Sequence, residues 1–226
     1  MEDGKNMINK LNVLYEDNHI IVVEKPINVL SQSDNTHDMD LLTMVKEYVK
    51  VKYNKPGNVY IGLVQRLDRP VGGIMVFART SKAAARLNKE QEDGIFKKHY
   101  LAIVNGFLDL KSGCLVDNLK KTNNGNTIVS SDGKKSSLKY IVLQENKVTN
   151  HSLLSIDLLT GRHHQIRVQF ASRGHSLCGD QRYGIRDKTQ LALFAYKIEF
   201  IHPVTKKEMK FELKLPSNSY WTEFTM

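Results

Sequence analysis

Short apolar runs bounded by turn residues dominate the pattern of hydrophobic and polar positions along the chain. Such runs are typical of β-strands. The pattern predicts strands over residues 11–15, 20–24, 73–78, 99–105, 137–144, 152–159, 191–201 and 207–215, the last two forming a hairpin around Pro203. The stretch between 105 and 137 is rich in Asn, Gly, Ser and Lys, and we expect a polar loop there.

Three segments have apolar side chains at helical spacing. The first covers residues 40–52, where Asp40 is placed to cap the helix. The second covers 80–92, where Thr80 or Ser81 is placed to cap the helix and Gly94 ends it, and the third covers 163–172. Because strands outnumber helices and do not alternate strictly with them, the sequence predicts an α+β fold with a largely antiparallel, mixed sheet and flanking helices.

The chain shows no internal repeat and no linker with a shift in composition. We therefore expect a single domain over residues 11–226, preceded by an N-terminal arm over residues 1–10. No apolar run approaches the ~20 residues that span a bilayer, and the polar start lacks a signal-peptide core. Cys114 and Cys178 lie far apart and are interpreted as reduced thiols. These features predict a cytoplasmic protein without a membrane partner.

Positive charge is the strongest compositional signal. The 226 residues include 33 Lys and Arg against 24 Asp and Glu, a net charge of +9. A domain this basic often binds a polyanion, because displacing counterions from phosphates favours association. The other interpretation is that the charge only keeps the protein soluble.

The arginines are confined to two stretches, whereas lysines occur throughout. Of the 33 basic residues only 9 are Arg, four within 66–86 and five within 162–186. A guanidinium group binds phosphate and carboxylate with a planar fork and stacks on bases, which an ammonium group does not do. We therefore expect the functional chemistry in these two stretches.

The first stretch contains Gln65-Arg66-Leu67-Asp68-Arg69-Pro70-Val71-Gly72-Gly73, which we expect to form a loop before a strand. Flanking cations keep a carboxylate ionised, which suits Asp68 to act as a nucleophile or general base. The alternative is a structural salt bridge, the commoner role of an aspartate beside arginine.

The second stretch contains Thr160-Gly161-Arg162-His163-His164-Gln165-Ile166-Arg167. If Thr160 or Gly161 opens the helix, its first N–H groups and Arg162 offer an anion site. Arg162 and Gln165 then share one helix face, while Ile166 and Phe170 face the core. Adjacent histidines on a helix diverge by ~100°, so no metal site is expected at His163-His164.

A basic and aromatic cluster, Lys97-Lys98-His99-Tyr100-Leu101-Ala102, enters a predicted strand. Tyr100 either stacks on a base or packs in the core, and without further context the core is favoured. The sequence has no Walker-type glycine loop, no GxGxxG between strand and helix, and no GxSxG elbow. The remaining candidates are a lone carboxylate, arginines and an aromatic side chain in a basic protein. This set fits chemistry on a nucleotide that needs neither metal nor cofactor.

Four motifs in order resemble the RluA-type RNA pseudouridine synthases. They are Leu14–Asp17 through Glu24-Lys25-Pro26, Arg66-Leu67-Asp68-Arg69 with Gly73, Lys98–Ala102, and Thr160–Arg167 followed by Gly179-Asp180 and Tyr183-Gly184. Gln65 departs from the usual histidine of that family, and Pro70-Val71-Gly72 from a common Asp/Ala-Thr-Ser sequence. Only about ten residues precede the first predicted strand, so we expect no S4-type RNA-binding domain.

The resemblance implies that Asp68 acts at a uridine of rRNA or tRNA, whose base is flipped out and rejoined through C5. It implies that Tyr100 stacks on the uracil, that Arg162 pairs with Asp68, and that Arg66 fills the gap left by the flipped nucleotide. Arg69, Gln165 and Arg167 belong to the same motifs and are expected to bind substrate. The resemblance implies an isomerase whose reaction needs no cofactor. We also expect no metal, no obligate protein partner and a monomeric protein.

Two other hypotheses remain open at this point. A non-catalytic RNA-binding or assembly protein could retain the fold, although Asp68, Tyr100 and Arg162 are all intact. A cofactor-free hydrolase would need a second carboxylate as acid, for which Asp180 is the candidate in a matching motif.

Overall fold

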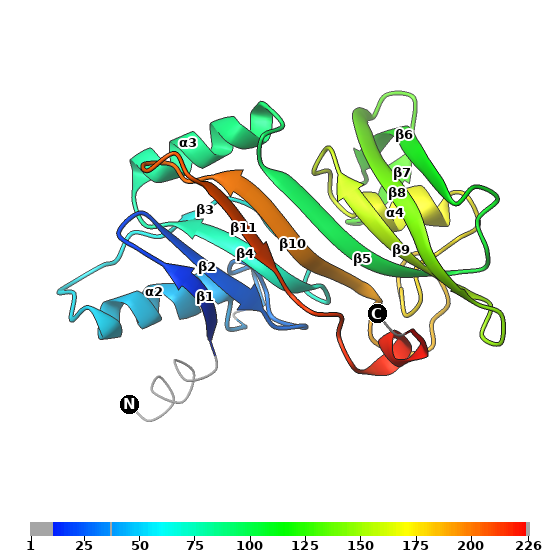
Figure 1. Cartoon of the computed structure of the whole chain (residues 1–226), viewed down its shortest axis with the longest axis horizontal. Coiled ribbons are helices and arrows are strands. Elements are labelled where there is room, and N and C mark those ends of the chain that lie inside the picture. Colours follow the sequence, from blue (N-terminus) through cyan, green and yellow to red (C-terminus); the bar gives the residue numbers. More distant parts are fainter. Residues whose placement is uncertain (1–10, 37, 225–226) are drawn as a thin grey trace. The chain divides into compact units, whose positions relative to one another are not determined.

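The computed structural model describes residues 11–36 and 38–224, so the predicted arm over residues 1–10 lies outside the described residues. The chain divides into two compact units (Figure 1). Unit 1 comprises the residues up to Phe96 together with Lys197–Leu213. Unit 2 comprises Lys97–Tyr196 and the residues from Lys214 onward.

Unit 1 is a sheet of short strands with two helices. Strands β1 (Asn12–Glu16), β2 (Ile20–Lys25) and β4 (Gly72–Ala78) lie in this order, and β10 (Leu193–Ile201) follows β4. The two-residue β3 (Gly62–Leu63) pairs with β4, and β11 (Glu208–Glu212) pairs with β10. The pairs β1–β2, β2–β4, β3–β4 and β10–β11 are antiparallel.

The two helices of unit 1 begin at capping residues that the sequence indicated. Helix α2 (Leu41–Lys52) starts after Asp40, whose carboxylate accepts from Thr43 N. Helix α3 (Ser81–Glu92) starts after Thr80 in the same way. The core of this unit is formed by apolar side chains of β2, β4, α3 and β10, including Ile20, Val22, Ile74, Val76, Leu87, Phe96, Ile198 and Phe200.

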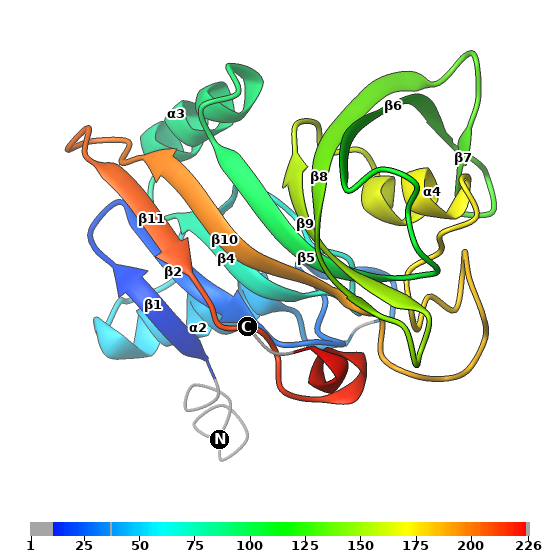
Figure 2. The same cartoon turned by 45° about the vertical axis from the view of Figure 1, so that its right-hand side comes forward.

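Unit 2 is a strongly bent antiparallel sheet that holds one short helix. The strands lie in the order β5 (Lys97–Asn105), β9 (His151–Leu158), β8 (Lys134–Asn146), β6 (Ser112–Lys121) and β7 (Thr127–Val129). Figure 2 shows β6 and β8 bending around α4 (Gln165–Ala171). Tyr140 of β8 and Phe170 of α4 meet edge to face, with ring centroids 5.7 Å apart. A 3-10 helix, Ser219–Glu223, follows near the C-terminus.

The predicted α+β fold with a largely antiparallel sheet is confirmed, and two local predictions are wrong. The polar stretch between 105 and 137 is not a loop, because it forms β6 and β7 and the start of β8. The third helix begins at Gln165 rather than at 163 or earlier. Within the described residues, no helix is long and apolar enough to cross a membrane.

Candidate active site

Asp68 lies in unit 1 on the loop that leads into β4, as the sequence predicted. Its backbone carbonyl accepts a hydrogen bond from Val71 N at 3.0 Å, which closes a turn over Arg69 and Pro70. The Asp68 side chain is half-buried, whereas Arg66 and Arg69 are exposed. The half-buried Asp68 thus lies on a turn whose neighbouring arginines, Arg66 and Arg69, are exposed.

A buried serine fixes the residue before Asp68. Ser31 Oγ donates to Leu67 O at 2.7 Å and accepts from Leu67 N at 3.0 Å. Both backbone polar groups of Leu67 are therefore satisfied by one hydroxyl, away from water. The backbone leading to Asp68 cannot shift without breaking both bonds.

A buried lysine fixes the residues after Asp68. Lys25, at the end of β2, is only 1% exposed, and its Nζ donates to Pro26 O (2.9 Å), Arg69 O (3.1 Å) and Val71 O (2.7 Å). Burial lowers the pKa of Lys25 to about 7, and the nearby Asp68 carboxylate partly opposes this shift. An ammonium group has three N–H donors, which match the three carbonyls. Sequence reasoning quoted Lys25 only as part of a strand pair and missed this role.

Arg69 has a partner on the surface of the same unit. Its Nη1 lies 2.7 Å from Asp38 Oδ2, and both side chains are about half exposed (47%). An exposed pair of this kind contributes only about 0–1 kcal/mol. The pair orients Arg69 without holding it away from a stronger anionic ligand.

In unit 2, the third motif begins as a loop rather than as a helix. His164 adopts the left-handed conformation (φ 52°) just before α4, so the residues from Thr160 to His164 are not helical. The predicted anion site at a helix start near Thr160 is therefore wrong, and Arg162 and Gln165 do not share a helix face. Ile166 and Phe170 are buried, as predicted.

Gln165 is buried and binds the residues of this loop, so it is not available to a ligand. It is 3% exposed, and its Oε1 accepts from Thr160 Oγ1 (2.7 Å) and Arg162 N (3.0 Å). Its Nε2 donates to Ser137 O and Gln169 Oε1, each at 3.0 Å. Arg162 is left exposed on the loop, with Nε donating to Lys135 O at 3.2 Å.

Arg167 is also buried rather than presented to substrate. It is 6% exposed and binds the fully buried Asp180 through two bonds, Nε–Oδ2 at 2.8 Å and Nη2–Oδ1 at 2.7 Å. Asp180 Oδ1 also accepts from Arg182 N and Tyr183 N. Burial acts to raise the pKa of Asp180, but the guanidinium and these N–H groups outweigh it and lower the pKa. A carboxylate held in this way does not suit the acid of a hydrolase.

His163 and His164 do not diverge as a helix would require. Because His164 is left-handed, the two rings stack with centroids 3.7 Å apart. His163 Nδ1 lies 2.8 Å from Thr127 Oγ1, and His164 Nδ1 lies 2.7 Å from Tyr183 OH. Among the described residues, no group of three His, Cys, Asp or Glu side chains gathers as a metal site would need.

Tyr100 lies in β5 and is 7% exposed. Its register partner Ile156 is paired in turn with Tyr140. Its neighbour Lys98 reaches the third motif, because Nζ lies 3.3 Å from the point where a Cβ would stand on Gly161. Burial lowers the pKa of Lys98.

Exposed lysines lie at the end of β6 and at the start of β8, and Arg162 Nε donates to the backbone carbonyl of one of them, Lys135. Leu119 pairs with Lys134 and Asn118 with Lys135, which places the end of β6 beside the start of β8. We call the exposed side chains there the basic surface; they are Lys120, Lys121, Lys134, Lys135 and Arg162. Asp132 pairs with Lys120 alone among these five cations, and the other four leave the basic surface with a positive net charge. A surface of this kind suits a polyanion.

Comparison with known proteins agrees with this chemistry. The family model described as RNA pseudouridylate synthase matches residues 19–172. The chain is 32% identical over 214 residues to an uncharacterized RNA pseudouridine synthase, YhcT, of Bacillus subtilis, covering 92% of this chain and 70% of that protein. It is 30% identical over 222 residues to ribosomal large subunit pseudouridine synthase C of Buchnera aphidicola, covering 92% and 68%.

The fold agrees as well. The structure of human RNA Pseudouridylate Synthase Domain Containing 4 superposes with a TM-score of 0.81 at 17% identity, covering 98% of this chain and 95% of that one. The chain belongs to the RNA pseudouridylate synthase family. It is an RNA-modifying isomerase, and the resemblance to the RluA-type enzymes is confirmed by the synthases C and D among its relatives.

Proposed function

We propose that this enzyme converts a uridine of structured RNA to pseudouridine with Asp68 as its catalytic carboxylate. The observation that carries the proposal is that the backbone is held on both sides of Asp68. Ser31 binds Leu67 before it, and Lys25 binds the carbonyls of Arg69 and Val71 after it. Holding a reacting group in one geometry lowers the barrier of the step in which it takes part. A structural salt bridge would not need this fixation on both sides.

The proposed reaction exchanges one bond to the sugar for another. The N1–C1′ bond breaks with assistance from Asp68, the uracil turns over, and C5 bonds to C1′. The proton on C5 then leaves and N1 gains a proton, so substrate and product are isomers. No atom is gained or lost, and the balance calls for no redox cofactor.

The other predicted residues take separate roles in this proposal. Tyr100 stacks on the displaced uracil and Arg162 supplies positive charge to the reaction, while Arg66 occupies the gap in the stack after flipping. Arg69 binds phosphate, for which it exchanges its exposed partner Asp38. Gln165 and Arg167 act as positioning residues, since both are buried and hydrogen-bonded inside unit 2. We propose that residues 11–226 act as one catalytic domain.

The RNA class follows from the relatives and from the basic surface. The relatives from Buchnera and Zymomonas are named as synthases of the large ribosomal subunit, which favours rRNA over tRNA as the first substrate to test. The lysines of the basic surface provide the phosphate contacts that such an RNA requires. We place the activity in the cytoplasm, with a monomeric enzyme that needs no protein partner.

The test is site mapping of pseudouridine in rRNA and tRNA after incubation with purified full-length protein. We expect wild type to modify a defined uridine, and Asp68→Asn to fold and bind the same RNA without modifying it. Asp93→Asn is the matched control, because Asp93 pairs only with Lys89 on the surface of α3. Substantial turnover by Asp68→Asn would remove this carboxylate from the mechanism. Binding without modification by wild type would instead favour a non-catalytic RNA-binding protein.

A further inference from the structure

A second positively charged segment lies in unit 2, beyond the motifs used so far. We call residues 181–190 the basic loop, which runs between Asp180 and Leu191. It carries Arg182, Arg186 and Lys188 against one acidic residue, Asp187. Its first residues belong to the third motif, since Arg182 N and Tyr183 N bind Asp180. The remainder has no role in the function proposed above.

The single carboxylate of the basic loop accepts hydrogen bonds from the loop itself and from Tyr220. Asp187 Oδ1 accepts from Thr189 N (2.9 Å), Thr189 Oγ1 (2.6 Å) and Gln181 Nε2 (3.0 Å). Asp187 Oδ2 accepts from Tyr220 OH at 2.5 Å. The two oxygens of the carboxylate thus accept four hydrogen bonds in all. The loop is therefore closed into a fixed shape by its own acidic residue.

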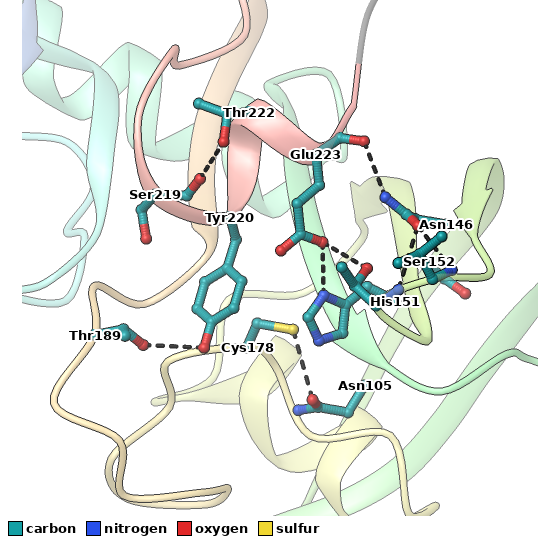
Figure 3. A network of polar contacts seen from close by, with 12 residues as sticks. Asn105, Asn146, His151, Ser152, Cys178, Thr189, Ser219, Tyr220, Thr222 and Glu223 are labelled. Atoms are coloured by element: carbon teal, nitrogen blue, oxygen red, sulfur yellow. Dashed lines mark hydrogen bonds and ion pairs between the residues drawn. The ribbon is translucent and has the colours of Figure 1, made fainter.

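The C-terminal 3-10 helix holds the basic loop from outside. Figure 3 shows the Tyr220 hydroxyl beside Thr189, with the Oγ1–OH distance 3.2 Å. The helix is itself anchored, because Glu223 Oε2 accepts from His151 Nδ1 (2.7 Å) and Thr149 Oγ1 (2.8 Å). Trp221 is 4% exposed. Tyr220 thus connects a firmly seated helix to the loop.

The cations of the basic loop outnumber its one carboxylate. Arg186 and Lys188 are exposed, and within the part of the chain that the structure describes neither side chain forms a salt bridge. The nearby acids Asp180 and Glu223 are engaged by Arg167 and His151. A hydrogen-bonded segment with an excess of exposed cations fits the phosphodiester backbone of a nucleic acid.

We propose that the basic loop is a second RNA contact, at which Arg186 and Lys188 bind backbone phosphates of the substrate RNA, and that Tyr220 positions this loop. The proposal rests on the proposed function only in taking the substrate RNA as its ligand. Tyr220 touches neither RNA nor the reacting atoms and acts through Asp187 and Thr189.

The charge contribution is tested by RNA binding at a series of salt concentrations. We expect Arg186→Ala and Lys188→Ala each to weaken binding several-fold and to reduce the slope of log affinity against log salt by ~0.7 to ~0.9. The single-turnover rate at saturating enzyme should stay at the wild-type value. Lys82→Ala, on the exposed face of α3, is the control for loss of one positive charge. Affinity and slope equal to wild type in both loop variants would overturn the proposal.

The positioning role is tested with Tyr220→Phe, which keeps the ring and removes the hydroxyl. We expect weaker RNA binding and an effect that is not additive with Arg186→Ala, because both changes act through one loop. Thr222→Val is the matched control, since Thr222 Oγ1 donates only to Ser219 O within the 3-10 helix. A lower melting temperature of Tyr220→Phe with unchanged RNA affinity would overturn the positioning role.

The two levels of proposal fail differently. If wild type modifies no uridine in any RNA, the proposed function fails, whereas the loop proposal is still decided by the salt series on bound RNA. If wild type modifies RNA and every loop variant binds like wild type, only the loop proposal fails.

Discussion

The backbone around Asp68 in unit 1 and the third motif in unit 2 are fixed by different kinds of bond. Around Asp68, Ser31 and Lys25 bind backbone N–H and C=O groups. In the third motif, Arg167 binds the carboxylate of Asp180, so one full charge meets another. Carbonyl dipoles compensate a buried ammonium less well than a carboxylate compensates a guanidinium, and only the lysine has its pKa moved to about 7.

This difference separates stability from catalytic geometry. The Arg167–Asp180 pair depends on both partners, and removal of either leaves a buried charge. The Lys25 ammonium group, which binds three carbonyls, can lose its proton near neutral pH, and the neutral amine can remain buried. We therefore expect changes in unit 2 to act mainly on folding, and changes around Asp68 to act mainly on turnover.

The largest effect is expected for Asp180→Asn. The substitution leaves the buried Arg167 guanidinium without a counter-charge, which costs about 3–5 kcal/mol of unfolding free energy. Urea denaturation measures this loss. Asp132→Asn removes the charge of an exposed pair with Lys120 and leaves an oxygen that can still accept from Ser130 Oγ, so it should cost at most about 1 kcal/mol. Equal stability of the two variants would contradict the role assigned to the buried pair.

A smaller effect is expected for Ser31→Ala. The Leu67 N–H then lies buried without its acceptor, at a cost of about 1–3 kcal/mol. Turnover should fall as well, because Leu67 precedes Asp68. Ser33→Ala, an exposed neighbour, is the control for unfolding and for rate. A wild-type rate in Ser31→Ala would show that Asp68 does not depend on this hydroxyl.

Lys25→Met tests the other side of the same loop. The methionine fills the space but binds none of the three carbonyls, so the loop loses its fixed geometry and the single-turnover rate should fall on the order of tenfold. RNA affinity should change little, since Lys25 is buried. Loss of affinity at an unchanged rate would place Lys25 in RNA binding instead.

The smallest effect is a pH dependence that wild type shows and Lys25→Met lacks. Burial lowers the pKa of Lys25 from 10.5 to about 7, so between these values the unfolded chain retains a proton that the folded protein has released. The unfolded state then binds more protons, and the contribution of Lys25 to stability rises with pH across this window. The neutral amine has only two N–H donors for three carbonyls, so turnover should fall meanwhile. The unfolding free energy and the turnover rate of wild type and Lys25→Met are compared at pH 6.5 and pH 9.5. If the difference in unfolding free energy and the ratio of rates are the same at both pH values, this assignment is wrong.

Features set by neighbouring residues could be predicted from the sequence. Asp40 and Thr80 cap their helices because each side chain binds a backbone N–H three residues ahead. The loop with Asp68 before β4 was predicted for the same reason, since proline and glycine fix its limits. These signals need no knowledge of the rest of the fold.

Features that depend on distant partners could not be predicted. Strands β6 and β7 look like a polar loop in the sequence, and they form because β6 pairs with β8 on one side and with β7 on the other. Helix α4 begins only after His164, whose left-handed backbone interrupts the helix and whose ring bonds Tyr183, 19 residues further along the chain. Ser31 and Lys25 meet the Asp68 loop across 36 and 46 residues of sequence, and no local pattern reports such a distance.

The path of the chain also sets the order in which the protein matures on the ribosome. Unit 1 is completed only by Lys197–Leu213, which emerge after the 100 residues Lys97–Tyr196. At a synthesis rate of about 5–20 residues per second, the first 96 residues wait about 5–20 s for β10 and β11. During that interval Ile20, Ile74 and Phe96 lack Ile198 and Phe200 as packing partners. The nascent segment is therefore exposed to proteases and aggregation until residues 197–213 have been made.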